Sequence, residues 1–269
     1  RPDDSTLPAK CVLGDVDDPR NTGRYMPQHG VAMSYLAKLF GDAENAKDRN
    51  RLKALLNEAV AFSVAAQSTQ GGWFYTSKIE GHDGIENVAT LLVLQGLLDA
   101  RDVGIAVPRE PLLKAHAHLK ACTTKEGGIL YAARVNEINP QGGGRPTITA
   151  MALAAYLPRA SLKDETLHRW LAFAAEQPGF DPRQLGAADD LLIHLYFSRA
   201  VFHLTSDHWR FAFGNKKMPE HLNWSKYRTA LFDHLQREQN KDGAWNRRGF
   251  ALGPVFNTAL VLNILLYEN

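Results

Sequence analysis

The sequence predicts an all-α protein built as an α/α barrel, or toroid, in which inner and outer helices alternate. The segment Gln-x-x-x-Gly-x-Trp occurs twice, at 67–73 and 239–245, and each copy separates two helical runs. A similar junction at Gly127 lies 56 residues after Gly71 and 116 residues before Gly243. Such self-similarity at a nearly fixed period is the signature of a repeat architecture.

The spacing of apolar residues predicts nine helices, and strand signals are essentially absent. Glycine, proline and polar clusters separate each helix from the next. The predicted helices cover residues 30–40, 49–67, 85–101, 109–121, 147–157, 164–176, 187–204, 224–239 and 254–267.

These helices fall into two classes that alternate along the chain. Helices that follow a glycine junction, such as those containing residues 88–94 and 150–155, are apolar on nearly all sides, which is typical of buried helices. Helices that precede a junction, such as the one containing residues 49–60, carry one apolar stripe and a charged face. An inner layer of apolar helices wrapped by an outer layer of amphipathic ones is an α/α barrel.

Length and charge favour one soluble domain that covers residues 1–269, with an irregular segment at 1–27. The 31 basic and 29 acidic residues are scattered, so neither a nucleic-acid patch nor an anionic membrane footprint is indicated. The apolar run at 88–98 is short and is interrupted by Gln95, so no membrane span is expected. The chain begins at Arg1 rather than at methionine, which favours an exported mature protein over a cytoplasmic one.

A closed toroid has twelve helices in six pairs, and the sequence supplies about nine. Because the first predicted helix is of the inner class, we expect about one and a half pairs to lie upstream. An open, C-shaped ring is the alternative, and its open edge is a possible site for a protein partner. If the upstream helices are missing, the helices near 31–39 and 255–266 should leave a gap and expose apolar surface, whereas direct packing of these two helices would show the inference to be wrong.

The repeated segment resembles the QW motif of squalene and oxidosqualene cyclases, whose α/α toroid is also found in protein prenyltransferase β subunits. As a repeat pattern the resemblance covers most of the chain, and it is closest to bacterial single-domain prenyltransferase and squalene oxidase repeat proteins. It implies a small apolar or oligomeric ligand, isoprenoid in kind for the cyclases, in a central cavity. If the protein is an enzyme, the resemblance implies a terpene cyclase-like reaction.

The motif has a structural explanation of its own. Gly71 and Gly243 permit a tight exit from a helix, the glutamine amide can bond freed backbone groups, and Trp73 and Trp245 fill wedges between helix pairs. We therefore expect the tryptophans to hold the helices together rather than to take part in chemistry.

Candidate site residues lie at the N-terminal ends of the inner helices, where exposed N–H groups favour anions. Several polar residues there are ordinary helix caps. His29, Arg145 and His194 are not explained by capping, and Asp190 lies four residues before His194 on the same helix face. The predicted catalytic residues are His29, Arg145, Asp190 and His194, and the predicted binding residues are Tyr25, Tyr75, Glu86, Asn87, Tyr131 and Asn257.

A literal Asp-x-Asp-Asp sequence, the proton-donating motif of class II terpene cyclases, occurs at 15–18. In that family the motif runs directly into an inner helix, whereas here Pro19 follows and the next predicted helix begins some ten residues later. An exposed acidic turn cannot hold a strongly acidic proton. Cys11 and Cys122 have neither Cys-x-x-Cys spacing nor the ligand set of prenyltransferase zinc, so no metal and no cofactor are predicted.

Three hypotheses of function remain open. The first is an isoprenoid- or lipid-handling toroid of the cyclase type, with an aromatic cavity. The second is a carbohydrate-active toroid similar to a uronate lyase, in which aromatic side chains stack on sugars while Arg145 and a histidine or tyrosine base handle a carboxylate sugar. The third is a scaffold without catalysis that binds a ligand or a protein.

Overall fold

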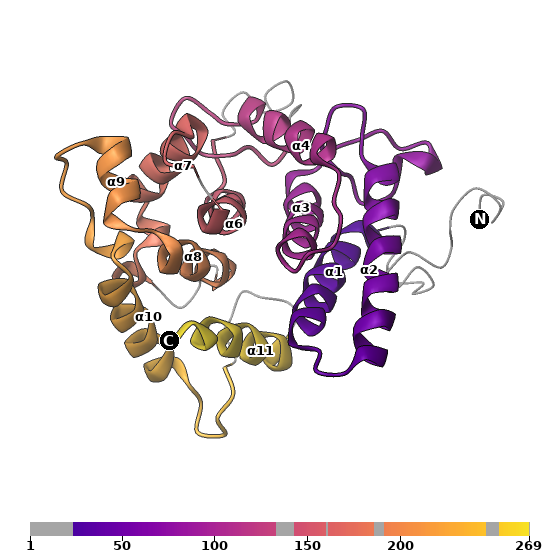
Figure 1. Cartoon of the computed structure of the whole chain (residues 1–269). Coiled ribbons are helices and arrows are strands. Elements are labelled where there is room, and N and C mark those ends of the chain that lie inside the picture. The colour runs from indigo at the N-terminus through magenta and orange to yellow at the C-terminus, as the bar shows by residue number, and fades with distance from the viewer. Residues whose placement is uncertain (1–23, 133–142, 160, 186–190, 246–252, 269) are drawn as a thin grey trace. The chain divides into compact units, whose positions relative to one another are not determined.

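The structure, a computed structural model, describes residues 24–132, 143–159, 161–185, 191–245 and 253–268 (Figure 1). Regular structure in these residues is helical, apart from one isolated β-bridge between Thr123 and Ile129. The α-helices are α1 (Tyr25–Asp42), α2 (Ala46–Ala66), α3 (Asn87–Asp102), α4 (Arg109–Ala121), α6 (Pro146–Tyr156), α7 (Glu165–Glu176), α8 (Leu191–His203), α9 (Ser206–Phe213), α10 (Trp224–Glu238) and α11 (Gly253–Leu265).

Short 3-10 helices lie in the connections and after some of the α-helices. They are η1 (Lys78–Glu80), η2 (Leu157–Arg159), η3 (Pro178–Phe180), η4 (Pro182–Gln184), η5 (Glu220–Leu222) and η6 (Leu266–Glu268). The predicted all-α fold is confirmed, and each of the nine predicted helices is present. The short helix α9 was not predicted.

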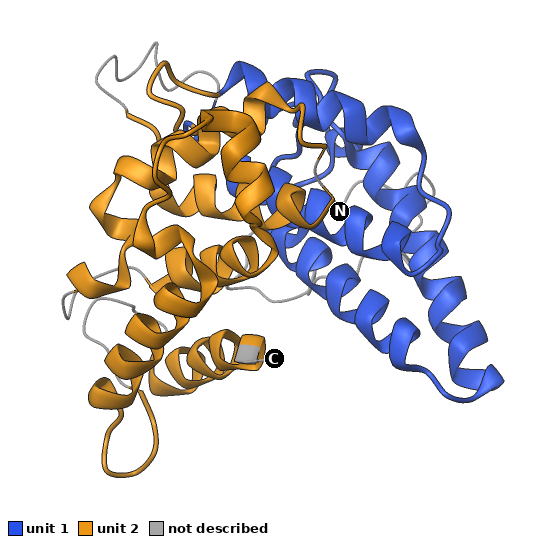
Figure 2. Cartoon of the chain, turned by 60° about the vertical axis from the view of Figure 1, so that its left-hand side comes forward, with its two compact units in different colours: residues 1–122, 130–142 blue, residues 123–129, 143–269 orange. Residues whose placement is uncertain are grey.

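The chain divides into two compact units (Figure 2). Unit 1 contains residues 1–122 and 130–142, and unit 2 contains residues 123–129 and 143–269. The single-domain organisation stays a prediction.

In unit 1 the inner helices α1 and α3 lie side by side (Figure 1). Glycine permits this close approach, because a Cβ atom at Gly96 would lie only 2.7 Å from the carbonyl oxygen of Gly30. Helix α2 covers α1 through the Phe62 ring, and α4 covers the start of α3 through His118. This is the predicted arrangement of inner helices backed by outer ones.

In unit 2 the inner helices are α6, α8 and α11, with α7 and α10 in the outer class. The inner helix α6 buries every residue from Ile148 to Ala155. The outer helix α10 instead buries one stripe, which contains Tyr227, Leu231, His234 and Leu235. The two predicted helix classes are therefore observed.

The first Gln-x-x-x-Gly-x-Trp segment forms a tight turn between α2 and α3. The Gln67 amide donates to the Gly71 carbonyl over 2.7 Å. The Trp73 indole is fully buried, and its N–H donates to the Ser63 carbonyl over 2.8 Å. The Trp73 backbone N–H donates to the Thr90 hydroxyl over 2.9 Å, which ties the turn to the inner helix.

The second segment, between α10 and α11, has the same internal geometry. The Gln239 amide donates to the Gly243 carbonyl over 2.8 Å, and the Trp245 indole N–H donates to the Leu235 carbonyl over 2.7 Å. The Trp245 backbone N–H donates to the Thr258 hydroxyl over 3.1 Å. Both tryptophans thus join the outer helix to the turn, as the structural interpretation expects.

The junction between α4 and α6 is a third copy of this turn without the tryptophan. Gly127 has a φ of 95°, and the Thr124 N–H donates to the Gly128 carbonyl over 2.8 Å. Ile129 stands where the other copies have tryptophan, and its N–H donates to the Thr149 hydroxyl over 3.0 Å. The repeat is therefore conserved in backbone geometry where the sequence is degenerate.

Candidate functional site

The richest polar cluster in unit 1 is at the start of the inner helix α3. Glu86 is 2 % exposed, and its two carboxylate oxygens accept the N–H groups of Val88 and Ala89, each over 2.8 Å. The Asn87 N–H donates to the Tyr131 carbonyl over 3.0 Å. Because the chain itself occupies these N–H groups, this helix start is not an anion site, contrary to our expectation for the inner helices.

Two tyrosine hydroxyls extend the cluster outward from the buried carboxylate. The Tyr131 hydroxyl bonds to Glu86 and also to the hydroxyl of Tyr75. The Arg24 guanidinium lies over the Tyr75 ring, 4.8 Å from its centroid. We call these four residues the tyrosine rim: Arg24, Tyr75, Glu86 and Tyr131.

Burial shifts the pKa of two groups of the tyrosine rim, the Tyr131 hydroxyl and the Glu86 carboxyl. Burial raises the pKa of Tyr131, and the hydrogen bond with Tyr75 and the Glu86 charge add to the rise. Burial also raises the pKa of Glu86, although the N–H groups of Ala89 and Val88 oppose the rise. Tyr131 is 39 % exposed, so its hydroxyl can meet a ligand as a neutral hydrogen-bonding group.

Tyr25 and Asn87, two further predicted binding residues, are occupied within the protein. The Tyr25 hydroxyl donates to Glu80 and accepts the Ser77 N–H over 2.9 Å, and the ring is 4 % exposed. The Asn87 amide donates to the Leu130 carbonyl over 2.7 Å. Both residues therefore hold connecting segments onto the inner helices.

His29 lies inside the helix layer of unit 1. Its Nε2 atom is 3.0 Å from the Ser63 hydroxyl and 3.3 Å from the Ala59 carbonyl, both on the outer helix α2. Burial lowers the pKa of His29 to about 4, although the contact with the Ala59 carbonyl raises it. A fully buried, neutral imidazole that faces α2 favours a packing role, and we do not propose His29 as catalytic.

His194 has the corresponding position in unit 2. It is fully buried on α8, and its Nδ1 atom is 2.8 Å from the hydroxyl of Tyr227 on the outer helix α10. The imidazole thus turns into the helix layer, which removes the geometric reason for a catalytic role.

The other predicted catalytic residues receive little support. Arg145 is exposed at the N-cap of α6 and makes no side-chain capping bond, and its backbone N–H donates to the Ile129 carbonyl over 2.7 Å. Asp190 lies outside the described residues. A common site of the four catalytic candidates would need residues of both units together with Asp190, so it stays a prediction.

Asn257, the last predicted binding residue, is 3 % exposed on α11. Its amide nitrogen has no hydrogen-bond partner among the described residues. The Asp-x-Asp-Asp sequence at 15–18 and Cys11 lie outside those residues.

A buried polar group that the sequence did not single out lies beside α3. His118 Nε2 is 2.8 Å from the Asn87 side-chain oxygen and 3.5 Å from the Cys122 sulfur. Burial lowers the pKa of His118 to about 4 and raises the pKa of the Cys122 thiol. Since one ring nitrogen makes both contacts, the imidazole cannot relay a proton from the thiol to the amide.

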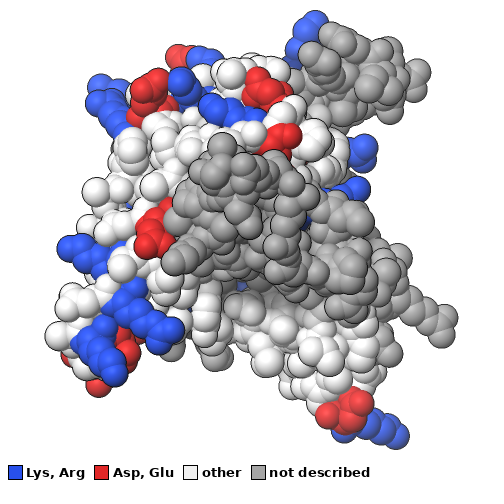
Figure 3. All heavy atoms as spheres, turned by 90° about the vertical axis from the view of Figure 1, so that its right-hand side faces the viewer, with Lys and Arg blue, Asp and Glu red and all other residues white. Residues whose placement is uncertain are grey.

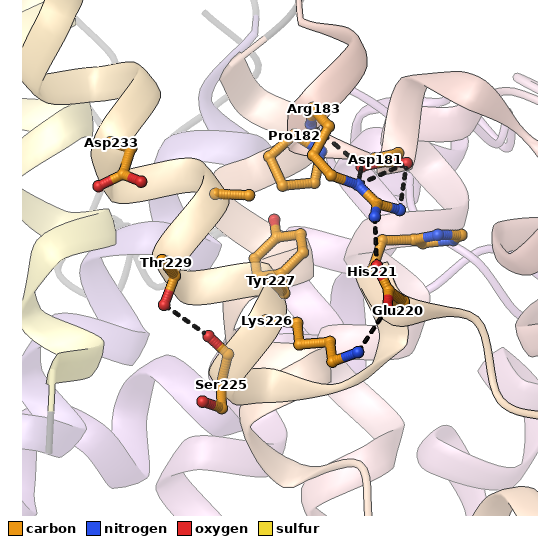
Figure 4. Close-up of a pocket in the computed structure, with 11 residues that line it drawn as sticks. Asp181, Pro182, Arg183, Glu220, His221, Ser225, Lys226, Tyr227, Thr229 and Asp233 are labelled. Atoms are coloured by element: carbon orange, nitrogen blue, oxygen red, sulfur yellow. Dashed lines mark hydrogen bonds and ion pairs between the residues drawn. The ribbon is translucent and has the colours of Figure 1, made fainter.

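Unit 2 contains an open pocket of about 400 Å³ on its outer side, between η4, η5 and α10 (Figure 4). Arg183 binds Asp181 through two nitrogens, Nε to Oδ1 over 2.9 Å and Nη2 to Oδ2 over 2.8 Å. Its Nη1 atom binds Glu220 over 2.5 Å, and Glu220 also binds the Lys226 ammonium. These two carboxylates and two cations neutralise one another, which suits a clip between segments better than a ligand site.

The Asp181 pKa reflects this clip. Burial raises the pKa of Asp181. The hydrogen bonds from Arg183 and Gln184 and the Arg183 charge outweigh burial and lower the pKa to about 2. The sequence signal for this ion pair was Asp-Pro-Arg at 181–183. It was missed because an aspartate and an arginine two residues apart resemble an ordinary turn.

Among the described residues, neither the distribution of charged side chains nor the positions of possible metal ligands indicate a second site. Basic and acidic side chains lie near one another on the face in Figure 3. Within the described ranges, no three histidine, cysteine, aspartate or glutamate side chains gather as metal ligands would. None of the helices described is long and apolar enough to cross a bilayer.

Comparisons with known proteins identify the fold and no family. No protein-family model and no curated protein matches the chain. A solved structure of a protein from Actinoplanes is similar, with 14 % identity and a TM-score of 0.56, and the match covers 90 % of this chain and 74 % of that one. The type II terpene cyclase MstE from Scytonema, solved with its product merosterolic acid A, matches at 14 % identity and a TM-score of 0.40, over 89 % of this chain and 86 % of that one.

Proposed function

We propose that this protein binds an elongated apolar molecule with one oxygen-bearing end, of the isoprenoid kind. The polar end would meet the tyrosine rim, and the apolar body would lie along the exposed face of α1. The observation that carries the proposal is the position of the rim at the N-terminal end of an exposed apolar stripe.

That stripe is a property of helix spacing. Val31, Tyr35 and Leu39 are 53 %, 62 % and 37 % exposed, and their spacing of four residues places them on one face of α1. Arg24, the N-cap residue of α1, precedes Val31 by seven residues, and its guanidinium lies over the Tyr75 ring of the rim. From Arg24 to Leu39 the helix spans about 22 Å, which is suited to a long-chain ligand.

The protonation of the rim favours recognition over proton abstraction. A tyrosine whose pKa is raised stays a hydroxyl at neutral pH, so Tyr131 is a poor general base. The Glu86 carboxylate accepts two backbone N–H groups, which disfavours a strongly acidic proton on it. We therefore propose binding, and we assign no reaction to the described residues.

The test is ligand binding by purified protein. Native mass spectrometry first identifies any molecule retained after gentle purification. Titration with farnesol and geranylgeraniol, and with tetragalacturonate as the carbohydrate arm, then measures affinity through tryptophan fluorescence. We expect the isoprenoid alcohols to bind and the oligosaccharide not to bind.

Substitution of Tyr131 locates the site. Tyr131→Phe should weaken binding about fivefold, which corresponds to the loss of one hydrogen bond of about 1 kcal/mol. Tyr25→Phe is the matched control, because its hydroxyl is buried and occupied by Glu80 and Ser77. Binding of the oligosaccharide alone, or equal affinity in the wild type and Tyr131→Phe, would contradict the proposal.

A further inference from the structure

Each early junction of the repeat packs on the outer helix that follows it. At the first turn, the Gln67 amide makes a second hydrogen bond, to the Pro111 carbonyl of α4 over 2.9 Å. A Cβ atom at Gly71 would lie 2.6 Å from the Lys114 carbonyl oxygen, so helix and turn are in backbone contact. Gln67 and Gly71 are accordingly buried.

The junction at Gly127 and the junction between α7 and α8 also pack on the outer helix that follows them, but through different contacts. A Cβ atom at Gly127 would overlap the Arg169 carbonyl of α7, and the Arg169 guanidinium donates to the Thr124 carbonyl over 2.5 Å. The junction between α7 and α8 is held to η5 and α10 by the clip from Asp181 to Lys226.

The fourth junction has the same turn, and no helix of the described part of unit 2 packs on its glycine. Gly243 has a φ of 85° and is exposed, and no described atom lies within 4 Å of the position its Cβ would take. Gln239 is also exposed, and its amide donates to the Gly243 carbonyl without the second bond that Gln67 makes to a neighbouring helix.

The inner helix after this turn gives a second, independent observation. Val255, Leu262 and Leu266 are 83 %, 52 % and 70 % exposed, on one face of α11 and the turn that follows it. An exposed apolar face on the helix that follows this turn is of the kind that marks an interface.

We propose that the surface formed by Gln239 and Gly243 binds one amphipathic α-helix, in the way that the first turn binds α4. The bound helix would present a backbone carbonyl to the Gln239 amide, as Pro111 does to Gln67. One turn further on, its backbone would pass across Gly243, as Lys114 does across Gly71. The proposal continues an interface that the chain itself forms at its earlier junctions, and it is independent of the ligand proposed for the tyrosine rim.

The probe is a synthetic copy of the helix that fits the first turn. A fluorescein-labelled peptide of residues 107–121, stapled between positions 109 and 113, is titrated with the full chain, and anisotropy reports binding. Arg109 and Leu113 are both exposed on α4, so the staple keeps the docking face intact. We expect saturable binding, and a scrambled stapled peptide should not bind.

Variants of the turn decide whether the peptide occupies this surface. Gly243→Leu should weaken binding by at least about tenfold, and Gln239→Ala by about fivefold, the size of one lost hydrogen bond. Gly81→Leu is the matched control, because Gly81 also has a positive φ, of 88°, and no atom within 4 Å. Thermal unfolding confirms that each variant is folded. Absence of peptide binding, or an equal loss in Gly243→Leu and Gly81→Leu, would overturn the proposal.

Discussion

At the scale of single residues, two buried imidazoles have pKa values far below that of histidine in water. His29 and His118 each have a pKa lowered to about 4 by burial. Such a histidine folds in its neutral form, so it links stability to pH without any catalytic role.

The first prediction follows from His29. Its pKa in the unfolded chain is about 6.5, so the stability it contributes is complete above that pH and is lost as the pH falls toward 4. His29→Gln should remove roughly 3 kcal/mol from the decrease in unfolding free energy over this range. Urea unfolding at several pH values measures the decrease. His82→Gln, at an exposed position, is the control, and an unchanged pH dependence in His29→Gln would contradict the assignment.

The sequence predicted which residues belong to the site better than it predicted where their side chains point. Tyr75, Glu86 and Tyr131 were all candidates, and the structure brings them together because the segments after two glycine turns meet at the start of α3. The directions of His29 and His194 depend on Ser63 and Tyr227, which are more than thirty positions away in the sequence. Periodicity along one helix carries no information about such partners.

At the scale of elements, the glycine turns are the parts whose sequence requirement is most direct. Each of the three turn glycines has a positive φ, which costs an L-residue about 1–2 kcal/mol. Gly71 and Gly127 have a second requirement, since the next outer helix leaves no room for a Cβ atom. Gly243 has only the first requirement, the positive φ.

The second prediction compares two of these glycines. Gly243→Ala should lower the unfolding free energy by about 1–2 kcal/mol, because only backbone strain is added. Gly127→Ala should cost clearly more, since the new methyl group overlaps the Arg169 carbonyl and α7 must move. Chemical denaturation of both variants gives the two values. Equal losses would mean that the turn at Gly127 is not packed against α7 as described.

The helices themselves were largely predictable, and the exceptions have physical causes. Helix α1 begins at Tyr25 rather than at residue 30, because Pro27 is acceptable in the first turn, where its missing N–H has no partner to bond. Helix α9 has only eight residues, too few for a clear apolar period. Its capping box uses His208 where glutamate or glutamine is usual, so the start signal was also hidden.

At the scale of the whole molecule, the helices near 31–39 and 255–266 carry exposed apolar faces. The sequence predicted apolar exposure on both, and the structure confirms it separately for α1 in unit 1 and for α11 in unit 2. The predicted closure of the ring is a property of both units together and stays a prediction. Internal repeats reveal the unit of construction, but they do not state how many copies make the complete particle.

The last prediction tests whether the α11 face is surface or core. Val255 and Leu266 are 83 % and 70 % exposed, so the double variant Val255→Glu/Leu266→Glu should change the unfolding free energy by less than about 0.5 kcal/mol. It should also reduce binding of the dye anilinonaphthalene sulfonate, because the apolar stripe is replaced by charge. Ile264→Glu is the matched contrast on the same helix: this side chain is fully buried, so an unpaired charge there should unfold unit 2. If the double variant destabilised the protein as strongly as Ile264→Glu, the stripe would be covered in solution by another part of the protein, and this face of α11 would be interior rather than surface.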